Sequence, residues 1–238
     1  MATFVLVHGT WHGGWCWRKV TPLLVEHGHT VYAPTLTGMG ERAHLLSEAV
    51  GLDTHIRDIL QVLFFEDLRD VILVGHSYAG SILSAVAETV ADRIARLVYL
   101  DAFIPRDGDS LFSMLGPRSE AYYRNRADEE GRGWLIPPLS PKDFGATDPT
   151  DIAWMQTRLV AVPVSTFADP VRLPGNAAAQ LPRSYIFCKG FGFSMQAAQA
   201  KAEGWDYHEL ATGHDAMITK PRDLTEILVE PAVCAPAR

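Results

Sequence analysis

Short apolar runs alternate along the chain with segments in which apolar residues recur at helical spacing. The runs are too uniformly apolar for surface strands, which favours strands buried on both faces. We predict strands at residues 4–7, 30–33, 71–74, 96–101, 184–188 and 205–210. Helical spacing predicts helices at residues 17–24, 54–64, 81–87, 193–203 and 221–229. This alternation predicts an α/β fold with a parallel sheet and helices on both faces.

The pattern lapses between residues 103 and 182, where prolines separate short helical pieces. The segment is too long for a plain connection and too rich in Phe, Trp, Leu and Met for a disordered linker. We therefore predict a lid inserted over a site, within a single domain that spans residues 1–238.

Composition narrows the classes of partner. With 47% hydrophobic and 21% charged residues the chain is ordinary for a soluble globular enzyme, and no run approaches the roughly 18 apolar residues of a membrane span. The net charge of −7 argues against nucleic acid as the main partner and leaves small neutral substrates open. Cys16, Cys188 and Cys234 form no C-x-x-C pair, and the N-terminus has no basic or cleavable segment, so we expect a cytoplasmic protein.

The strand at 71–74 leads into Gly75-His76-Ser77-Tyr78-Ala79-Gly80 and then into a helix. This is the strand-turn-helix of a nucleophile elbow, with Ser77 at the apex and Ala79 in the place of the usual second glycine. By the geometry of such a turn, the backbone N–H of Tyr78 donates to a developing oxyanion. The alternative is a serine that only caps the helix.

Three ordered motifs together resemble the α/β-hydrolase fold, and more closely its esterase and hydroxynitrile lyase branch, which includes plant methyl-ester esterases. They are the opening segment 4–17, the turn around Ser77, and Gly213-His214-Asp215-Ala216-Met217. The resemblance covers essentially the whole chain, although the lid matches only in position and length. It implies about six mainly parallel strands, with the lid after the fourth, and a nucleophile, an acid and a histidine in that chain order.

The resemblance also implies the partners of Ser77. An unassisted serine hydroxyl is a poor nucleophile, and His214 lies where the fold places its general base. The backbone N–H of Thr10 completes the oxyanion hole, by the match of the His-Gly segment. We expect His76 to support the site from behind. His8 and His12 shape the loop near the oxyanion hole, either structurally or by touching substrate.

The acid departs from the family pattern. Relatives carry an aspartate just after the strand that corresponds to residues 184–188, but residues 189–202 contain neither Asp nor Glu. Asp101, at the end of the strand that follows the nucleophile helix, occupies an alternative position that some α/β-hydrolases use. A Ser-His dyad, or an acid from the lid, stays open.

Several residues are candidates for the substrate pocket. Cys16 fits a core position better than a pocket position, and the tryptophans of the opening segment are more often packing residues. The candidates are Gly9, Trp11, His12, Cys16, Trp134 and Trp154.

We expect a serine hydrolase that cleaves small apolar carboxylic or carbamic esters through an acyl-enzyme. Bacterial carbendazim-type carbamate hydrolases share the opening motif. A cyanohydrin lyase is a second hypothesis, but those lyases carry threonine at the position of Gly9 and lysine at that of Asp215, and an anionic Asp215 disfavours a departing cyanide. A non-catalytic ligand-binding homologue is the third. We expect no metal and no cofactor, and a homodimer stays open.

Overall fold

The computed structural model describes residues 1–230, and Cys234 lies outside them. Six strands form one sheet in which every neighbouring pair is parallel. Across the sheet the order is β2 (Thr30–Tyr32), β1 (Thr3–Val7), β3 (Val71–His76), β4 (Ile94–Leu100), β7 (Arg183–Cys188) and β8 (Asp206–Leu210). The predicted parallel α/β sheet is confirmed, with strand ends within two residues of their predicted positions.

The central strands β1 and β3 have no solvent-facing side. All six residues of β3 are buried, and so are the last four of β1. This explains their uniformly apolar runs, because side chains of a covered parallel strand point alternately into two apolar layers.

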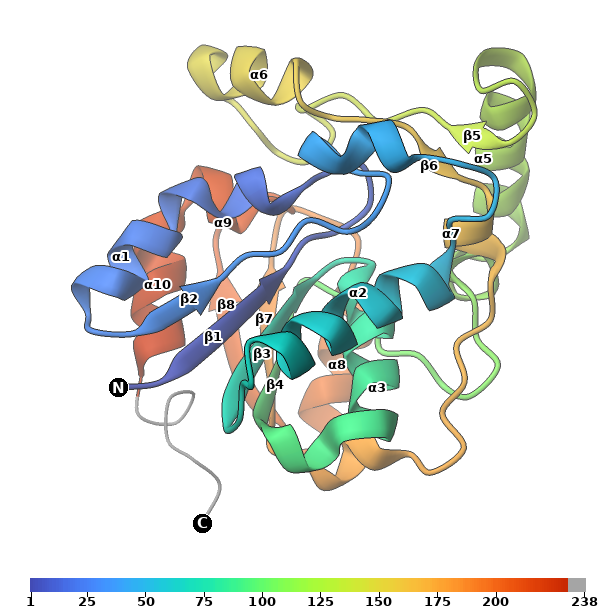
Figure 1. Ribbon diagram of the computed structural model, residues 1–238. Coiled ribbons are helices and arrows are strands. Elements are labelled where there is room, and N and C mark those ends of the chain that lie inside the picture. The colour runs from blue at the N-terminus through green and yellow to red at the C-terminus, as the bar shows by residue number, and fades with distance from the viewer. Residues whose placement is uncertain (231–238) are drawn as a thin grey trace.

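Helices cover both faces of the sheet (Figure 1). On one side α1 (Thr21–Glu26) lies beside α10 (Pro221–Val229), and on the other α2 (Leu52–Phe65) packs against α3 (Ala79–Val90). The remaining helices of the sheet layers are α8 (Ser194–Ala202) and α9 (Ala216–Thr219). The predicted helix at 17–24 is split, since Gly14–Lys19 forms a 3-10 helix before α1. The segment between β2 and α2 also contains a 3-10 helix, Gly40–Leu45.

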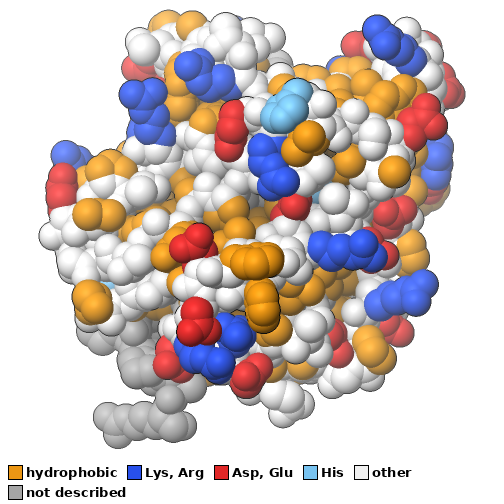
Figure 2. All heavy atoms as spheres, viewed as in Figure 1, with side chains coloured by type: hydrophobic (Ala, Val, Ile, Leu, Met, Phe, Trp, Pro, Cys, Tyr) orange, Lys and Arg blue, Asp and Glu red, His pale blue; other side chains and the backbone are white. Residues whose placement is uncertain are grey.

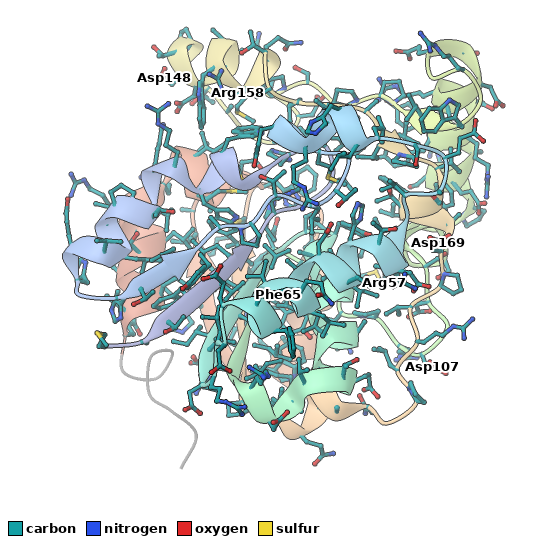
Figure 3. The ribbon with its side chains drawn as sticks, viewed as in Figure 1. Arg57, Phe65, Asp107, Asp148, Arg158 and Asp169 are labelled. Atoms are coloured by element: carbon teal, nitrogen blue, oxygen red, sulfur yellow. The ribbon has the colours of Figure 1, made fainter. Side chains whose placement is uncertain are left out.

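Helix α2 buries only a narrow stripe of its surface. Leu52, His55, Ile59 and Leu63 are buried, whereas Phe64 is 63% exposed. Successive helix residues are about 100° apart, so Phe64 falls outside a stripe spaced by three and four residues. Phe65, labelled in Figure 3, is exposed beside it.

Most of the segment between β4 and β7 lies over the carboxyl ends of the strands, at the top and upper right of Figure 1, and its last part runs down beside α3 toward β7. Its elements are α4 (Leu111–Leu115), α5 (Pro117–Glu130), β5 (Leu135–Ile136), α6 (Pro149–Gln156), β6 (Val162–Pro163), α7 (Ser165–Ala168) and the 3-10 helix Ala177–Gln180. The short strands β5 and β6 pair with each other in antiparallel fashion.

Carboxylates fasten the last part of this segment to α2 and α3. Asp169, labelled in Figure 3, accepts a hydrogen bond from the backbone N–H of Leu52 at 3.1 Å, at the start of α2. Glu88 of α3 accepts from the N–H of Gly175 at 2.7 Å and of Ala177 at 2.5 Å. These contacts hold the return of the chain toward β7 against the helix layer.

Acidic and basic side chains are interspersed over the face drawn in Figure 2. Within residues 1–230, no helix combines the length and the apolar character that crossing a membrane requires.

Candidate active site

Ser77 lies at the tip of a tight turn between β3 and α3. Its φ of +56° is in the left-handed region, which residues other than glycine rarely adopt. The backbone on both sides is tied to the end of β4: the N–H of Ser77 donates to the Leu100 carbonyl at 3.2 Å, and its carbonyl accepts from the N–H of Phe103 at 3.1 Å. Such a conformation persists only where surrounding contacts enforce it, and it is common at functional sites.

Glycines at two positions make this turn possible. A Cβ at Gly75 would lie 2.6 Å from Cδ1 of Leu83, and a Cβ at Gly80 would collide with the carbonyl of Phe103. Ala79, the departure from the usual motif, is buried without such a conflict. No side-chain hydrogen bond caps α3, so Ser77 is not a helix-capping residue.

His214 and Asp101 form a short, buried contact at the carboxyl ends of the strands. His214 Nδ1 lies 2.6 Å from Asp101 Oδ2, and Asp101 is fully buried. The other carboxylate oxygen accepts from the backbone N–H of Cys188 at 3.1 Å. Because the carboxylate accepts, Nδ1 of His214 carries the proton and Nε2 is left with a free lone pair.

Aromatic rings occupy the region where relatives of this fold carry their acid. Phe191 and Phe193, just after β7, stack on the His214 ring with centroids 4.2 Å and 5.2 Å away. Asp101 approaches the same imidazole from the end of β4, with its own φ at +43°. The empty acid position that the sequence revealed is therefore filled by apolar packing.

One cavity of about 90 Å³ brings the predicted residues together. Ser77, His214 and Thr10 supply polar groups, and the rest of the wall is largely apolar and aromatic. The other lining residues are Trp11, Phe103, Leu111, Leu115, Tyr123, Leu139, Phe144, Phe167, Phe191 and Phe193.

The two predicted oxyanion donors are both available. Among residues 1–230, neither the backbone N–H of Thr10 nor that of Tyr78 donates a hydrogen bond to a protein group. The side chain of Tyr78 points away from this role, because it is buried and its hydroxyl meets His55 Nδ1 at 2.9 Å.

His55 is a residue that the sequence reasoning missed. Its Nε2 lies 3.1 Å from the Thr37 carbonyl, which can only accept, so Nδ1 is the acceptor for the Tyr78 hydroxyl. Burial lowers the pKa of His55 to about 4, which keeps the ring neutral. A histidine on the apolar face of a helix, between Leu52 and Ile59, was the available signal.

Of the six pocket candidates, only Trp11 lines the cavity. Gly9 lies behind Ser77, where a Cβ would come within 3.0 Å of both Ser77 Cβ and His76 Nδ1. Cys16 is fully buried in the core, as the apolar character of the segment favoured.

The two lid tryptophans lie elsewhere. Trp154 packs edge-on against Trp15 at 5.0 Å and borders a separate hollow with Asp151. Trp134 is absent from the cavity wall, and its carbonyl accepts from the N–H of Val164. Their positions differ from expectation because the spacing of aromatic residues in an irregular segment does not determine which way they face.

Two histidines support the site from behind. His8 Nε2 accepts from the N–H of Leu36 at 3.1 Å, so its Nδ1 donates to the Gly9 carbonyl at 2.7 Å, and burial lowers its pKa to about 3. His76 Nε2 donates to the His214 carbonyl at 3.1 Å, and burial holds its pKa well below the usual value. Both rings are neutral parts of the frame.

His12 and Asp215 face each other rather than the cavity. The nearest atoms, His12 Nε2 and Asp215 Oδ2, are 2.9 Å apart, and both residues are buried. Asp215 therefore does not face a departing anion, contrary to the expectation from the sequence, because this carboxylate is turned toward an imidazole and does not line the cavity. Within residues 1–230, no group of three or more His, Cys, Asp or Glu side chains could hold a metal ion.

The sequence of this chain is similar to those of known proteins along almost its whole length. The model of the alpha/beta hydrolase family matches residues 4–227. A carbendazim hydrolyzing esterase from Nocardioides sp. is 41% identical over 240 residues, which cover 96% of this chain and 98% of that protein. Polyneuridine aldehyde esterase from Rauvolfia serpentina is 26% identical over 95% of this chain and 94% of its own.

A solved structure gives the same picture. An extracellular alpha/beta-hydrolase from a Paenibacillus species, described as sharing structural and functional homology with tobacco salicylic acid binding protein 2, superposes with a TM-score of 0.86. It is 26% identical, and the match covers 96% of this chain and 98% of that one.

Proposed function

Since the chain belongs to the alpha/beta hydrolase family, we propose that it is a serine hydrolase that cleaves small apolar carboxylic or carbamic esters through an acyl-enzyme. The observation that carries the proposal is the 2.6 Å contact of His214 with the buried carboxylate of Asp101, at a cavity that Ser77 also lines. A base held in one tautomer beside a strained serine is the arrangement that nucleophilic catalysis requires.

In the first half of the reaction, Ser77 Oγ attacks the carbonyl carbon of the ester. His214 Nε2 takes the hydroxyl proton and passes it to the departing alcohol, so an acyl-enzyme and a free alcohol result. In the second half, water attacks the acyl group, and the same nitrogen takes its proton and returns one to Ser77. Asp101 stays ionised and stabilises the imidazolium that forms in each half.

The backbone N–H groups of Thr10 and Tyr78 receive the negative charge of the tetrahedral intermediates. Each such donor contributes roughly 3 kcal/mol of transition-state stabilisation. His55 positions one of them indirectly, because it holds the Tyr78 side chain at the start of α3.

The cavity argues for a small, apolar substrate. Its volume is about 90 Å³, well below the ~300 Å³ at which pockets for drug-sized ligands begin, so it accepts one small group of the substrate at a time. The carbendazim hydrolyzing relative makes a methyl ester of an aryl carbamate the specific substrate we infer. Residues 103–182 would then act as a lid, because α4, α5, α7 and the loop between β5 and α6 supply much of the cavity wall.

Turnover of p-nitrophenyl acetate and of an aryl methyl carbamate tests the proposal. We expect hydrolysis by the wild-type enzyme and its loss in Ser77→Ala, because Ser77 carries the hydroxyl that the tight turn presents to the cavity. Equal turnover by Ser77→Ala would remove the serine mechanism. Cell fractionation and size-exclusion chromatography measure the cytoplasmic location and the homodimer, which stay predictions.

A further inference from the structure

His12 differs from the other buried histidines because acceptors face both of its ring nitrogens. Nδ1 lies 2.7 Å from the Thr10 carbonyl and Nε2 lies 2.9 Å from Asp215 Oδ2. A carbonyl oxygen can only accept, so Nδ1 carries a proton, and an ionised carboxylate also only accepts, so Nε2 carries a second. In this arrangement His12 is an imidazolium paired with a buried carboxylate.

The surroundings of His12 support the charged ring. Burial disfavours its charge, but the charge of Asp215 and the hydrogen bonds outweigh burial, so the pKa of His12 is raised above its usual value. The indole of Trp15 stacks on the ring at 5.4 Å with an interplanar angle of 24°, and an aromatic face attracts a cation. Burial lowers the pKa values of His8 and His76, which are equally buried. Neither has a carboxylate as close as His12 has, since Asp215 Oδ1 lies 3.6 Å from His76 Nε2.

The segment 9–12, here called the oxyanion loop, needs such support. Trp11 has a φ of +66°, a region that bulky residues avoid. His12 holds the carbonyl of Thr10, and the N–H of Val160 holds the carbonyl of Trp11 at 3.0 Å. These two bonds fix the loop on the C-terminal side of the Thr10 amide. The peptide plane of that amide is held from the other side by the Gly9 carbonyl, which accepts from His8 Nδ1 at 2.7 Å.

Asp215 connects this loop to the base. It follows His214 directly in the chain, and its own N–H donates to the Phe144 carbonyl at 3.1 Å. Its contact with His12 joins positions 203 residues apart in the sequence. The loop that presents the oxyanion donor and the loop that presents the general base therefore meet at this pair.

We propose that His12 and Asp215 are positioning residues, a buried ion pair that locks the oxyanion loop onto the loop of His214. The role rests on the proposed serine mechanism, in which the Thr10 amide and the His214 ring act on one carbonyl group. The pair touches no substrate. It acts by holding the Thr10 amide and the His214 ring, which do contact the substrate, in position.

Asp215→Asn tests the pair with almost no change in side-chain size. We expect kcat for p-nitrophenyl acetate to fall about 10-fold to 100-fold with little change in KM, because small displacements of catalytic groups cost that much. Inhibition by benzeneboronic acid, which mimics the tetrahedral intermediate, should weaken by the same factor. Asp206→Asn is the matched control: it removes the carboxylate of another His–Asp contact, to His208 at 3.3 Å, and should leave kcat unchanged.

Nitrogen-15 NMR of histidine-labelled wild-type enzyme reads the charge state without any substitution. We expect both ring nitrogens of His12 to be protonated at neutral pH, and only one in Asp215→Asn. A single protonated nitrogen in the wild type would overturn the ion pair. If Asp215→Asn does not fold, His12→Asn, which retains a donor for the Thr10 carbonyl but no charge, replaces it in the kinetic test.

Unchanged kcat in a folded Asp215→Asn would overturn the positioning role. That result is distinct from failure of the proposed function. If the wild type hydrolyses the ester and Ser77→Ala does not, the serine mechanism stands and only the role of the pair falls. If Ser77→Ala is as active as the wild type, the serine mechanism itself falls.

Discussion

Two His–Asp contacts lie back to back in this protein, and they differ in the second nitrogen of the imidazole. His214 gives Nδ1 to Asp101 and keeps Nε2 free at the cavity, whereas His12 has an acceptor at each nitrogen. The first ring can take up a proton during a reaction, and the second already holds two. The same pair of residue types is thus suited to a general base at the cavity and to a structural ion pair behind it. The difference lies in the Thr10 carbonyl, which occupies the second nitrogen of His12.

Removing the charge of the front pair should have the largest effect. Asp101→Asn leaves the shape of the site but takes away the acceptor that selects the tautomer of His214, so kcat should fall about 10⁴-fold. Steady-state hydrolysis of p-nitrophenyl acetate measures the change. Asp67→Asn, at an exposed position, is the control and should keep full activity. Near-normal turnover by Asp101→Asn would leave a Ser-His dyad or another acid.

Acid should lower the free energy of unfolding, because the buried histidines His8 and His55 resist protonation in the folded protein. His8 and His55, with pKa values of about 3 and 4, stay neutral when folded, while in the unfolded chain they take up protons below about pH 6.5. The unfolded state then binds more protons, so the free energy of unfolding should fall by up to roughly 3 kcal/mol per pH unit between about pH 6 and pH 4.

Urea unfolding between pH 7 and pH 5 measures this slope, and His55→Phe should make it shallower. A stability that does not change over that range would mean that these two rings are charged in the folded protein. His12 works in the opposite direction: its raised pKa contributes stability that is present below about pH 6.5 and is lost as the pH rises through the folded value.

A smaller loss of activity should follow when the Tyr78 amide, the second of the proposed oxyanion donors, is less firmly held. His55→Leu removes the acceptor of the Tyr78 hydroxyl and leaves that hydroxyl buried, so the start of α3 should shift. We expect kcat to fall about 10-fold with KM nearly constant. Adding Tyr78→Phe to His55→Leu separates the effect of the buried, unpaired hydroxyl from the effect of the lost His55 ring. It removes the stranded hydroxyl, so activity should recover in part, and no recovery would exclude this route.

The smallest expected change concerns the rings stacked on His214. Phe193→Ala opens the cavity beside the base and should raise KM for aryl esters a few-fold, while alkyl esters are less affected, because the lost area is aromatic. Kinetics on a matched aryl and alkyl ester pair measure the difference. Equal changes in KM for both substrates would mean that Phe193 packs in the wall but does not discriminate between aryl and alkyl esters.

The sheet and its order of elements were predictable because buried strands and amphipathic helices leave periodic patterns. Ser77 and His214 were predicted from local motifs, and Asp101 from the lack of an acid after β7. The role of His55 was not predicted, because a histidine on the apolar face of a helix does not reveal its partner, and nothing local marks the contact of His12 with Asp215. Residues 203 positions apart meet only once the strand order β1-β3-β4-β7-β8 brings the loops to one edge. In the lid, irregular backbone left the direction of Trp134 and Trp154 undetermined.

Covalent labelling tests the central claim most directly. Diethyl p-nitrophenyl phosphate should phosphorylate the hydroxyl that the base activates, and peptide mass mapping then locates the adduct. We predict one adduct per chain, on Ser77, and labelling slowed at least 10³-fold in Asp101→Asn. An adduct on another residue, or none on Ser77, would contradict the account.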